Sequence, residues 1–212
     1  MLKTSALASP SGAPRRLRFV LVTALAAPLY IATGVLILAG LAKVKRPSAT
    51  AAALVELSIP APLVSARLLG AAEVVLGVLA IALGSPVLWA GVALSYGAFT
   101  LFVLWALGDK SRVGSCGCFG REDTPATPVH AAFNATAAAI AAIAVFDPVS
   151  LSSFDGSVFD AVLAAVLIAI GIALSVVGLT IVPRVLAQAQ GNAAPAVPEF
   201  SLDKKRTSRG AK

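Results

Sequence analysis

The sequence predicts an all-α membrane protein that crosses the bilayer five times. Only 13% of the 212 residues are charged and 58% are hydrophobic, whereas a soluble domain carries about a quarter charged residues. Several charge-free stretches also reach the roughly 20 residues that a helix needs to cross a bilayer core. This composition excludes a soluble globular enzyme and a disordered chain.

The same counts restrict the chemistry. The net charge of +7 does not indicate nucleic-acid binding, because the chain is too apolar for a basic binding surface to be its main feature. Two cysteines and one histidine exclude a disulfide framework, a four-cysteine zinc site and a multi-histidine metal centre.

The N-terminal part begins with a polar, basic tail over residues 1–18. Phe19–Ala42 then runs for 24 residues without a charge and is the first expected span. It is too long for the core of a signal peptide, so we expect it to be retained. The Ala-rich stretch Ser48–Ile59 follows as a short interfacial or loop helix, which Pro60 and Pro62 close.

The second and third spans come from a hydrophobic region that is too long for one helix. Val74–Gly108 contains 35 residues without a charge, and the Gly-Ser-Pro turn at 84–86 splits it. The expected spans are therefore Leu63–Leu83 and Val87–Leu107.

The C-terminal part adds two more spans. Pro128–Phe146 is the fourth, so that residues 19–147 form the expected four-helix bundle. Residues 148–183 hold a connection and the fifth span, Ala161–Pro183. For residues 184–212 we expect a polar, disordered tail.

The charges leave the orientation of the spans open. Lys3, Arg15, Arg16 and Arg18 favour a cytoplasmic N-terminus. Five spans then place the polar segment 109–127 on the extracytoplasmic side of the plasma (inner) membrane. Counted over all loops, however, the positive-inside rule favours the opposite arrangement.

Two groups of side chains are assigned to the membrane itself. The basic cluster Lys43, Lys45 and Arg46 is expected to bind lipid phosphates. Trp89 and Trp105 lie near the two ends of the third span, as in an aromatic belt. We expect four aromatic residues at the interface or in packing and not in a cofactor site: Trp89, Trp105, Tyr30 and Tyr96.

The chemistry of the chain is expected in the cysteine segment, Gly114–Gly120, between the third and fourth spans. Both cysteines, Cys116 and Cys118, lie here with Gly117 between them. Glycine allows a turn tight enough for the two sulfur atoms to meet. The ring so formed is small and strained, and strained, exposed disulfides are the labile and catalytic ones. We therefore expect a reversible redox pair.

Two other interpretations of the cysteines stay open. One is packing, although the polar, glycine-flanked context argues against it. The other is metal binding, in which Cys116 and Cys118 supply two ligands and His130 and Asp123 complete the set.

The second span carries charges that are costly inside a membrane and usually face protein or water. Glu73 shares a helix face with Gly70 and Gly77, and glycine faces are where helices approach closely. We expect Glu73 to point into the bundle, with Arg67 or Lys43 as its partner. Its role is either that of a proton acceptor or quinone contact, or that of a structural ion pair.

His130 and Asn134 lie one helical turn apart at the start of the fourth span. His130 follows Cys118 by twelve residues, close enough to reach the cysteine segment. A histidine near a thiol favours the nucleophilic thiolate, so His130 is a candidate activating residue. The alternative is an interfacial histidine that binds water or a lipid headgroup.

Three motifs occur in order along the chain: Gly34–Lys43, Arg67–Gly77 and, most specific, Ser115–Gly120, followed by His130 and Asn134. With these motifs the sequence resembles the MauE family of methylamine-utilisation membrane proteins, a branch near the DoxX-like proteins. The resemblance covers residues 18–147 and implies a four-helix membrane bundle of MauE/DoxX type, to which this chain adds a fifth C-terminal span.

The resemblance also implies a function. It points to thiol–disulfide redox or maturation of an extracytoplasmic protein, often beside a thioredoxin-like partner, and to methylamine metabolism. Thiol–disulfide oxidoreductase activity and the cofactor stay open, with a quinone among the candidate electron acceptors. A second interpretation is a non-enzymatic membrane subunit or maturation factor whose cysteines are structural or bind a metal.

Overall fold

The computed structural model describes residues 15–108, 127–149, 157–183 and 185, and for residues 15–25 it describes the backbone alone. Within these ranges the chain forms helices and no strand. The helices are α1 (Arg15–Lys45), α2 (Ser48–Glu56), α3 (Pro62–Leu83), α4 (Pro86–Gly108), α5 (Pro128–Phe146) and α6 (Val158–Thr180).

Five of these helices are long and apolar enough to cross a membrane. The exception is α2, which has nine residues and coincides with the short helix expected after the first span. The prediction of an all-α membrane protein is therefore confirmed.

Proline and glycine set several helix boundaries. Pro62, Pro86 and Pro128 are the first residues of α3, α4 and α5, where the helix does not need the missing N–H group. Gly84 follows α3 in the left-handed conformation, with φ of 59°, which glycine adopts without steric cost. The predicted turn between the second and third spans is thus confirmed.

The fifth span begins earlier than predicted, at Val158 and not at Ala161. The reason is a capping box formed by Ser157 and Asp160. The Ser157 hydroxyl accepts a hydrogen bond from the backbone N–H of Asp160 at 3.3 Å, and the Asp160 carboxylate accepts one from the backbone N–H of Ser157 at 3.0 Å. Asp160, which we had assigned to the connection before the fifth span, therefore belongs to the first turn of α6.

We expect Ser157→Ala to destabilise the first turn of α6 by about 0.5–2 kcal/mol, because it removes the N-cap hydrogen bond. Amide hydrogen exchange in detergent micelles should show faster exchange in that turn. Ser175→Ala is the matched control, since the Ser175 hydroxyl only donates to the Gly171 carbonyl within the helix. Equal effects of the two substitutions would contradict the capping role of Ser157.

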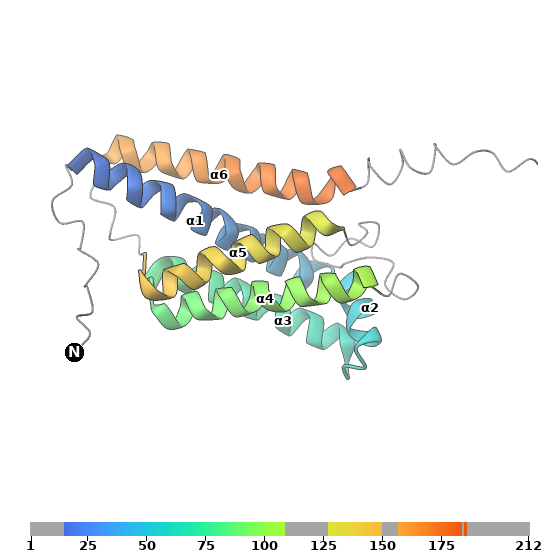
Figure 1. Ribbon diagram of the computed structural model, residues 1–212. Helices are drawn as coiled ribbons and strands as arrows, with labels where there is room; N and C mark the ends of the chain where they lie inside the picture. Colours follow the sequence, from blue (N-terminus) through green and yellow to red (C-terminus); the bar gives the residue numbers. More distant parts are fainter. Residues whose placement is uncertain (1–14, 109–126, 150–156, 184, 186–212) are drawn as a thin grey trace, which may run out of the picture.

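The spans pack as two antiparallel pairs, α1 with α3 and α4 with α5, and α6 lies along α1 on the outside of this core (Figure 1). Helix α2 packs against α3 at one end of the bundle. We call this the α2 end. It also holds the last turns of α4 and α6 and the first turn of α5, whereas α1 begins at the opposite end (Figure 1).

Helices α1 and α6 touch where an isoleucine side chain of each helix packs on a glycine of the other. A Cβ atom at Gly34 would lie 2.3 Å from the side chain of Ile172, and one at Gly171 would lie 2.4 Å from the side chain of Ile31. Small residues of this kind let membrane helices approach closely. A cavity of about 530 Å³ lies beside this contact, between α1, α3 and α6, and its lining is apolar apart from Tyr30.

Trp89 belongs to the core and not to an aromatic belt. It is fully buried, its indole N–H donates to the Val149 carbonyl at 3.2 Å, and the ring of Tyr30 packs edge-on against it. The belt prediction is therefore wrong for Trp89, because its face of α4 points into the bundle. Packing is confirmed for Trp89, Tyr30 and Tyr96, whereas Trp105 is 38% exposed.

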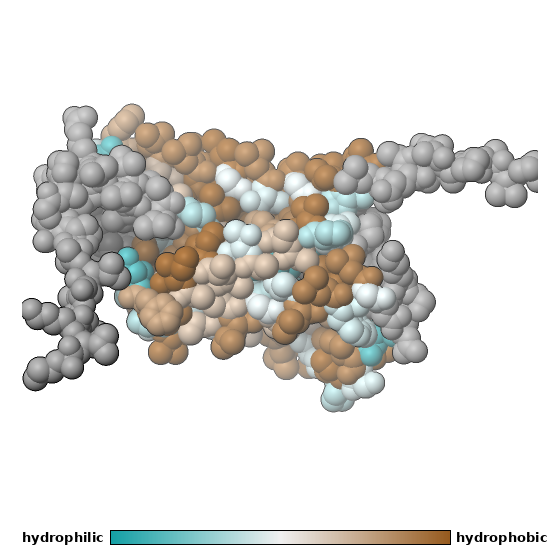
Figure 2. All heavy atoms as spheres, viewed as in Figure 1, coloured by the Kyte–Doolittle hydropathy of each residue, from teal (hydrophilic) through white to brown (hydrophobic). Residues whose placement is uncertain are grey.

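The outer surface of the spans is largely apolar: in Figure 2 brown and tan atoms cover most of the face shown, with pale and teal atoms between them. Leu94, Phe146 and Val158 are among the large hydrophobic side chains that are more than two-thirds exposed. Apolar surface of this extent marks a protein that contacts lipid or other proteins. It is the surface expected of a multi-pass membrane protein.

Candidate functional site

Besides Thr33 and Thr50, four polar or charged side chains are buried in the described part of the chain. They are Lys43 of α1, Glu73 of α3, and His130 and Asn134 of α5. We call them the polar cluster. Polar groups inside a membrane protein are costly, face the protein interior and mark functional or structural sites.

A close backbone contact between α1 and α3 positions two members of the polar cluster. A Cβ atom at Gly40 would lie 2.6 Å from the carbonyl oxygen of Gly70, and a Cβ atom at Gly70 would lie 2.6 Å from that of Gly40. Only glycine on both helices permits this approach. Lys43 and Glu73 each follow one of these glycines by three residues, so the crossing brings their side chains together.

Lys43 and Glu73 form a buried ion pair. The ammonium Nζ lies 2.7 Å from Glu73 Oε2, and the two side chains are 4% and 2% exposed. The ammonium also lies over the ring of Phe99, 5.0 Å from its centroid, where a cation is attracted by the aromatic face. The other carboxylate oxygen, Oε1, has no hydrogen-bond partner in the part of the chain described.

These contacts decide between the expected partners of Glu73. Burial on the glycine face and pairing with Lys43 are confirmed. Pairing with Arg67 is wrong, because Arg67 lies on an exposed face of α3. The lipid-phosphate assignment is wrong for Lys43, which is buried, whereas Lys45 and Arg46 are exposed.

His130 is held by the residue that precedes α5. Its Nδ1 lies 2.8 Å from the hydroxyl of Thr127, and Thr127 is the N-cap of α5. The threonine hydroxyl therefore fixes the imidazole ring and makes no N-cap hydrogen bond to the helix. Nε2 has the backbone of Leu179 nearby but no hydrogen bond of standard geometry to the described residues.

Burial also decides how His130 and Asn134 are placed. They are 2% and 8% exposed, so the face of α5 that their spacing predicts them to share points into the bundle. This burial does not fit an interfacial histidine at a lipid headgroup.

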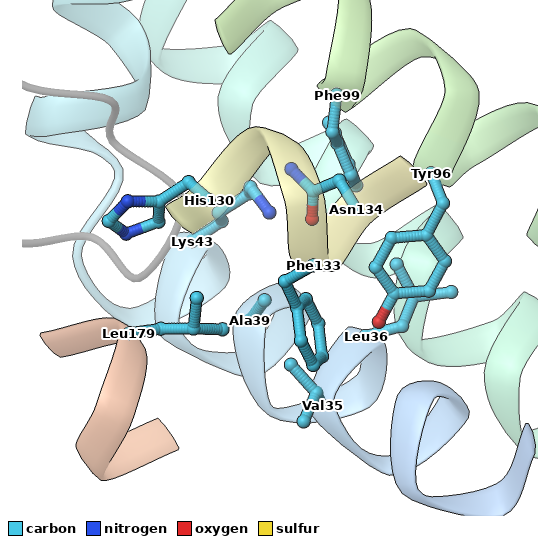
Figure 3. A pocket seen from close by; sticks show the side chains of 10 residues that line it. All are labelled: Val35, Leu36, Ala39, Lys43, Tyr96, Phe99, His130, Phe133, Asn134 and Leu179. Carbon is cyan, nitrogen blue, oxygen red and sulfur yellow. The ribbon is translucent and has the colours of Figure 1, made fainter. Parts of the chain in front are cut away.

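A small cavity adjoins the polar cluster. Its volume is about 30 Å³, and it lies between α1, α4, α5 and the end of α6. Figure 3 shows Lys43, His130 and Asn134 on one side of it, with the rings of Phe99 and Phe133 nearby. Apart from Lys43, His130, Asn134 and Tyr96, its lining is hydrophobic.

Cys116, Cys118 and Asp123 lie outside the described residues, so the redox pair and the metal-ligand set stay predictions. The helix ends that flank this part of the chain, the end of α4 and the start of α5, lie at the α2 end (Figure 1). No group of three His, Cys, Asp or Glu side chains with metal-site geometry occurs among the residues that the structure covers.

Comparison with known families identifies this arrangement. Residues 20–147 match the family model described as methylamine utilisation protein MauE. The chain belongs to the MauE family. The matched MauE region runs from α1 through α5 and contains the whole polar cluster, whereas α6 lies beyond it. No curated protein and no solved structure matches the chain.

The sequence interpretation missed Thr127 and Phe99 of this MauE site and assigned Tyr96 only to the interface or to packing. Thr127 carries a recognisable signal, because a threonine N-cap three residues before a side chain that reaches back to it is the spacing of a capping box. Phe99 and Tyr96 carry none, because aromatic residues on an apolar helix look alike until the partner helices are placed.

Proposed function

We propose that this MauE protein takes part in thiol–disulfide redox or disulfide-linked maturation of an extracytoplasmic protein, with Cys116 and Cys118 as the exchanging pair. The observation that carries the proposal is the position of the Cys-Gly-Cys sequence between α4 and α5. The adjoining helix ends lie at the α2 end, and the buried His130 lies in the first turn of α5.

The proposed step is a disulfide exchange with a thioredoxin-like partner. A thiolate of the pair attacks the partner's disulfide, forms a mixed disulfide and releases one partner thiolate. The second cysteine then attacks the mixed disulfide, so that Cys116 and Cys118 end as a disulfide and the partner as a dithiol. The two electrons pass to the partner, and the reverse reaction oxidises it. Each attacking thiol loses a proton, for which His130 is the proposed acceptor, and the two released partner thiolates take up two protons to give the dithiol.

The ion pair supports a structural role for Glu73. A carboxylate held at 2.7 Å from the Lys43 ammonium fixes α3 against α1, and the exchange reaction needs no proton acceptor at this depth. Glu73→Gln tests this assignment, because it keeps the shape of the side chain and removes the charge. Disulfide exchange should survive in the folded fraction of this variant, whereas its loss would favour a proton or quinone role.

We place the protein in the plasma (inner) membrane with the cysteine segment on the extracytoplasmic side. Two considerations support this orientation. The helix ends beside the segment lie opposite the start of α1 (Figure 1), and disulfide chemistry persists in oxidising compartments.

The proposal predicts two redox forms of the chain in cells. After acid trapping, a large maleimide should add to reduced Cys116 and Cys118 and leave the disulfide form unshifted on a gel. Cys116→Ser and Cys118→Ser should each abolish the unshifted form, and one of them should accumulate a mixed disulfide with the partner. A membrane-impermeant maleimide should label the reduced pair in intact cells.

Two results would count against this function. Complete alkylation under every redox condition would exclude a reversible disulfide and would leave the non-enzymatic maturation factor. Labelling by the impermeant reagent only after lysis would reverse the proposed orientation.

A further inference from the structure

The Lys43 ammonium and the Asn134 amide point toward each other beside the small cavity (Figure 3). They do not hydrogen-bond directly. Within the described part of the chain, Lys43 has one hydrogen-bond acceptor, Glu73 Oε2, and the Asn134 side chain has no partner. Two strongly polar groups that face each other without contact are the usual setting for a bridging water.

The side chains of Lys43 and Asn134 can form more hydrogen bonds than they make within the described part of the chain. An ammonium carries three donors, and a primary amide carries two donors and an acceptor. One Lys43 donor is bonded to Glu73, and the ammonium lies over the Phe99 ring. Buried polar groups in folded proteins are almost always satisfied by protein or by ordered water, and the neighbouring side chains Phe133, Leu36 and Val35 offer no acceptor.

The volume of the cavity limits which ligand it can hold. Its volume of about 30 Å³ exceeds the roughly 10–15 Å³ that a single water requires. It is much too small for a quinone, an acyl chain or a metabolite, whose sites span about 300–1,000 Å³. A water needs two to four polar partners, and Lys43 and Asn134 provide them, with His130 also in the lining.

We infer that this cavity is an internal water site, held by Lys43 and Asn134, that hydrates the buried ion pair at membrane depth. The site goes beyond the proposed function and does not depend on the cysteines. Its effect is to solvate the Lys43 ammonium, because a water there offsets part of the cost of removing the charge from solvent. Asn134 is then a positioning residue for the water.

Radiolytic labelling tests this site without any substitution. An X-ray pulse converts bound water to hydroxyl radicals, which oxidise the nearest aromatic ring. Tyr96 lines the small cavity and Tyr30 lines the large apolar one, and they are 2% and 4% exposed. In lipid nanodiscs and isotopically labelled water, we expect several-fold more labelled oxygen on Tyr96 than on Tyr30, because an apolar cavity stays dry.

Asn134→Leu is the matching variant, since it keeps the size of the side chain and removes the amide. It should lower labelling of Tyr96 to the level of Tyr30. The control is Thr136→Val on the exposed side of α5, where the hydroxyl donates only to the Ala132 carbonyl; labelling of Tyr96 should not change. Equal labelling of the two tyrosines in the unmodified protein, or full labelling of Tyr96 in Asn134→Leu, would overturn the inference.

Discussion

Glu73→Leu should destabilise this MauE protein by about 3–5 kcal/mol, because it leaves the Lys43 ammonium buried without its counter-charge. The effect should be large because Lys43 is 3% exposed and Glu73 is the one carboxylate that it contacts among the described residues. Reversible unfolding in mixed detergent micelles, followed by circular dichroism, measures the change.

The double variant Lys43→Leu/Glu73→Leu separates charge from packing. Replacing both members of a buried pair by apolar residues of similar size is often neutral or stabilising, so the double variant should recover most of the loss. Arg67→Leu is the control on the same helix, because Arg67 is exposed, and it should change stability little. A double variant as unstable as Glu73→Leu would show that the ion pair is not the cause.

Gly70→Ala should cost about 1–3 kcal/mol, the range for overpacking a close contact. The added Cβ would lie 2.6 Å from the Gly40 carbonyl oxygen and 2.8 Å from Lys43 Cβ. The first of these is a backbone atom, so relief requires α1 and α3 to move apart. The same movement would lengthen the Lys43–Glu73 contact.

Gly97→Ala is the matched control for Gly70→Ala. An added Cβ at Gly97 in α4 meets no atom within 4 Å, so alanine should be neutral there or stabilise by about 0.5–1 kcal/mol through its higher helix propensity. Thermal unfolding of both variants in the same detergent gives the comparison. If Gly97→Ala destabilised the protein as much as Gly70→Ala, the close approach of α1 and α3 would not explain the loss of stability in Gly70→Ala.

Much of this fold was predictable because the physics of a bilayer is strict. A run of about 20 apolar residues must be a helix, and proline and glycine at 84–86 mark where one span ends and the next begins. The family resemblance over residues 18–147 agrees with the matched region at 20–147. The glycine spacing around Glu73 also predicted its burial.

The incorrect predictions share one physical cause: the sequence of a single helix does not show which helices pack against it. Both Arg67 and Lys43 were sensible partners for Glu73, and only the crossing at Gly40 and Gly70 selects Lys43. Trp89 lies near a helix end, as belt residues do, but the direction of its face depends on where α1 lies. Asp160 was assigned to the connection before the fifth span because the sequence shows its charge but not the hydrogen bonds by which it caps α6.

The separation of Lys43 and Glu73 by 30 residues along the chain has a consequence for biogenesis. At about 5–20 residues per second, the ribosome completes α1 seconds before it supplies the carboxylate. Until then the lysine ammonium lies near the C-terminal end of a lone span, where its long stem lets the charge reach the headgroups. The ion pair can therefore form only once α3 has been inserted, and until then α1 carries a charge that the finished bundle neutralises.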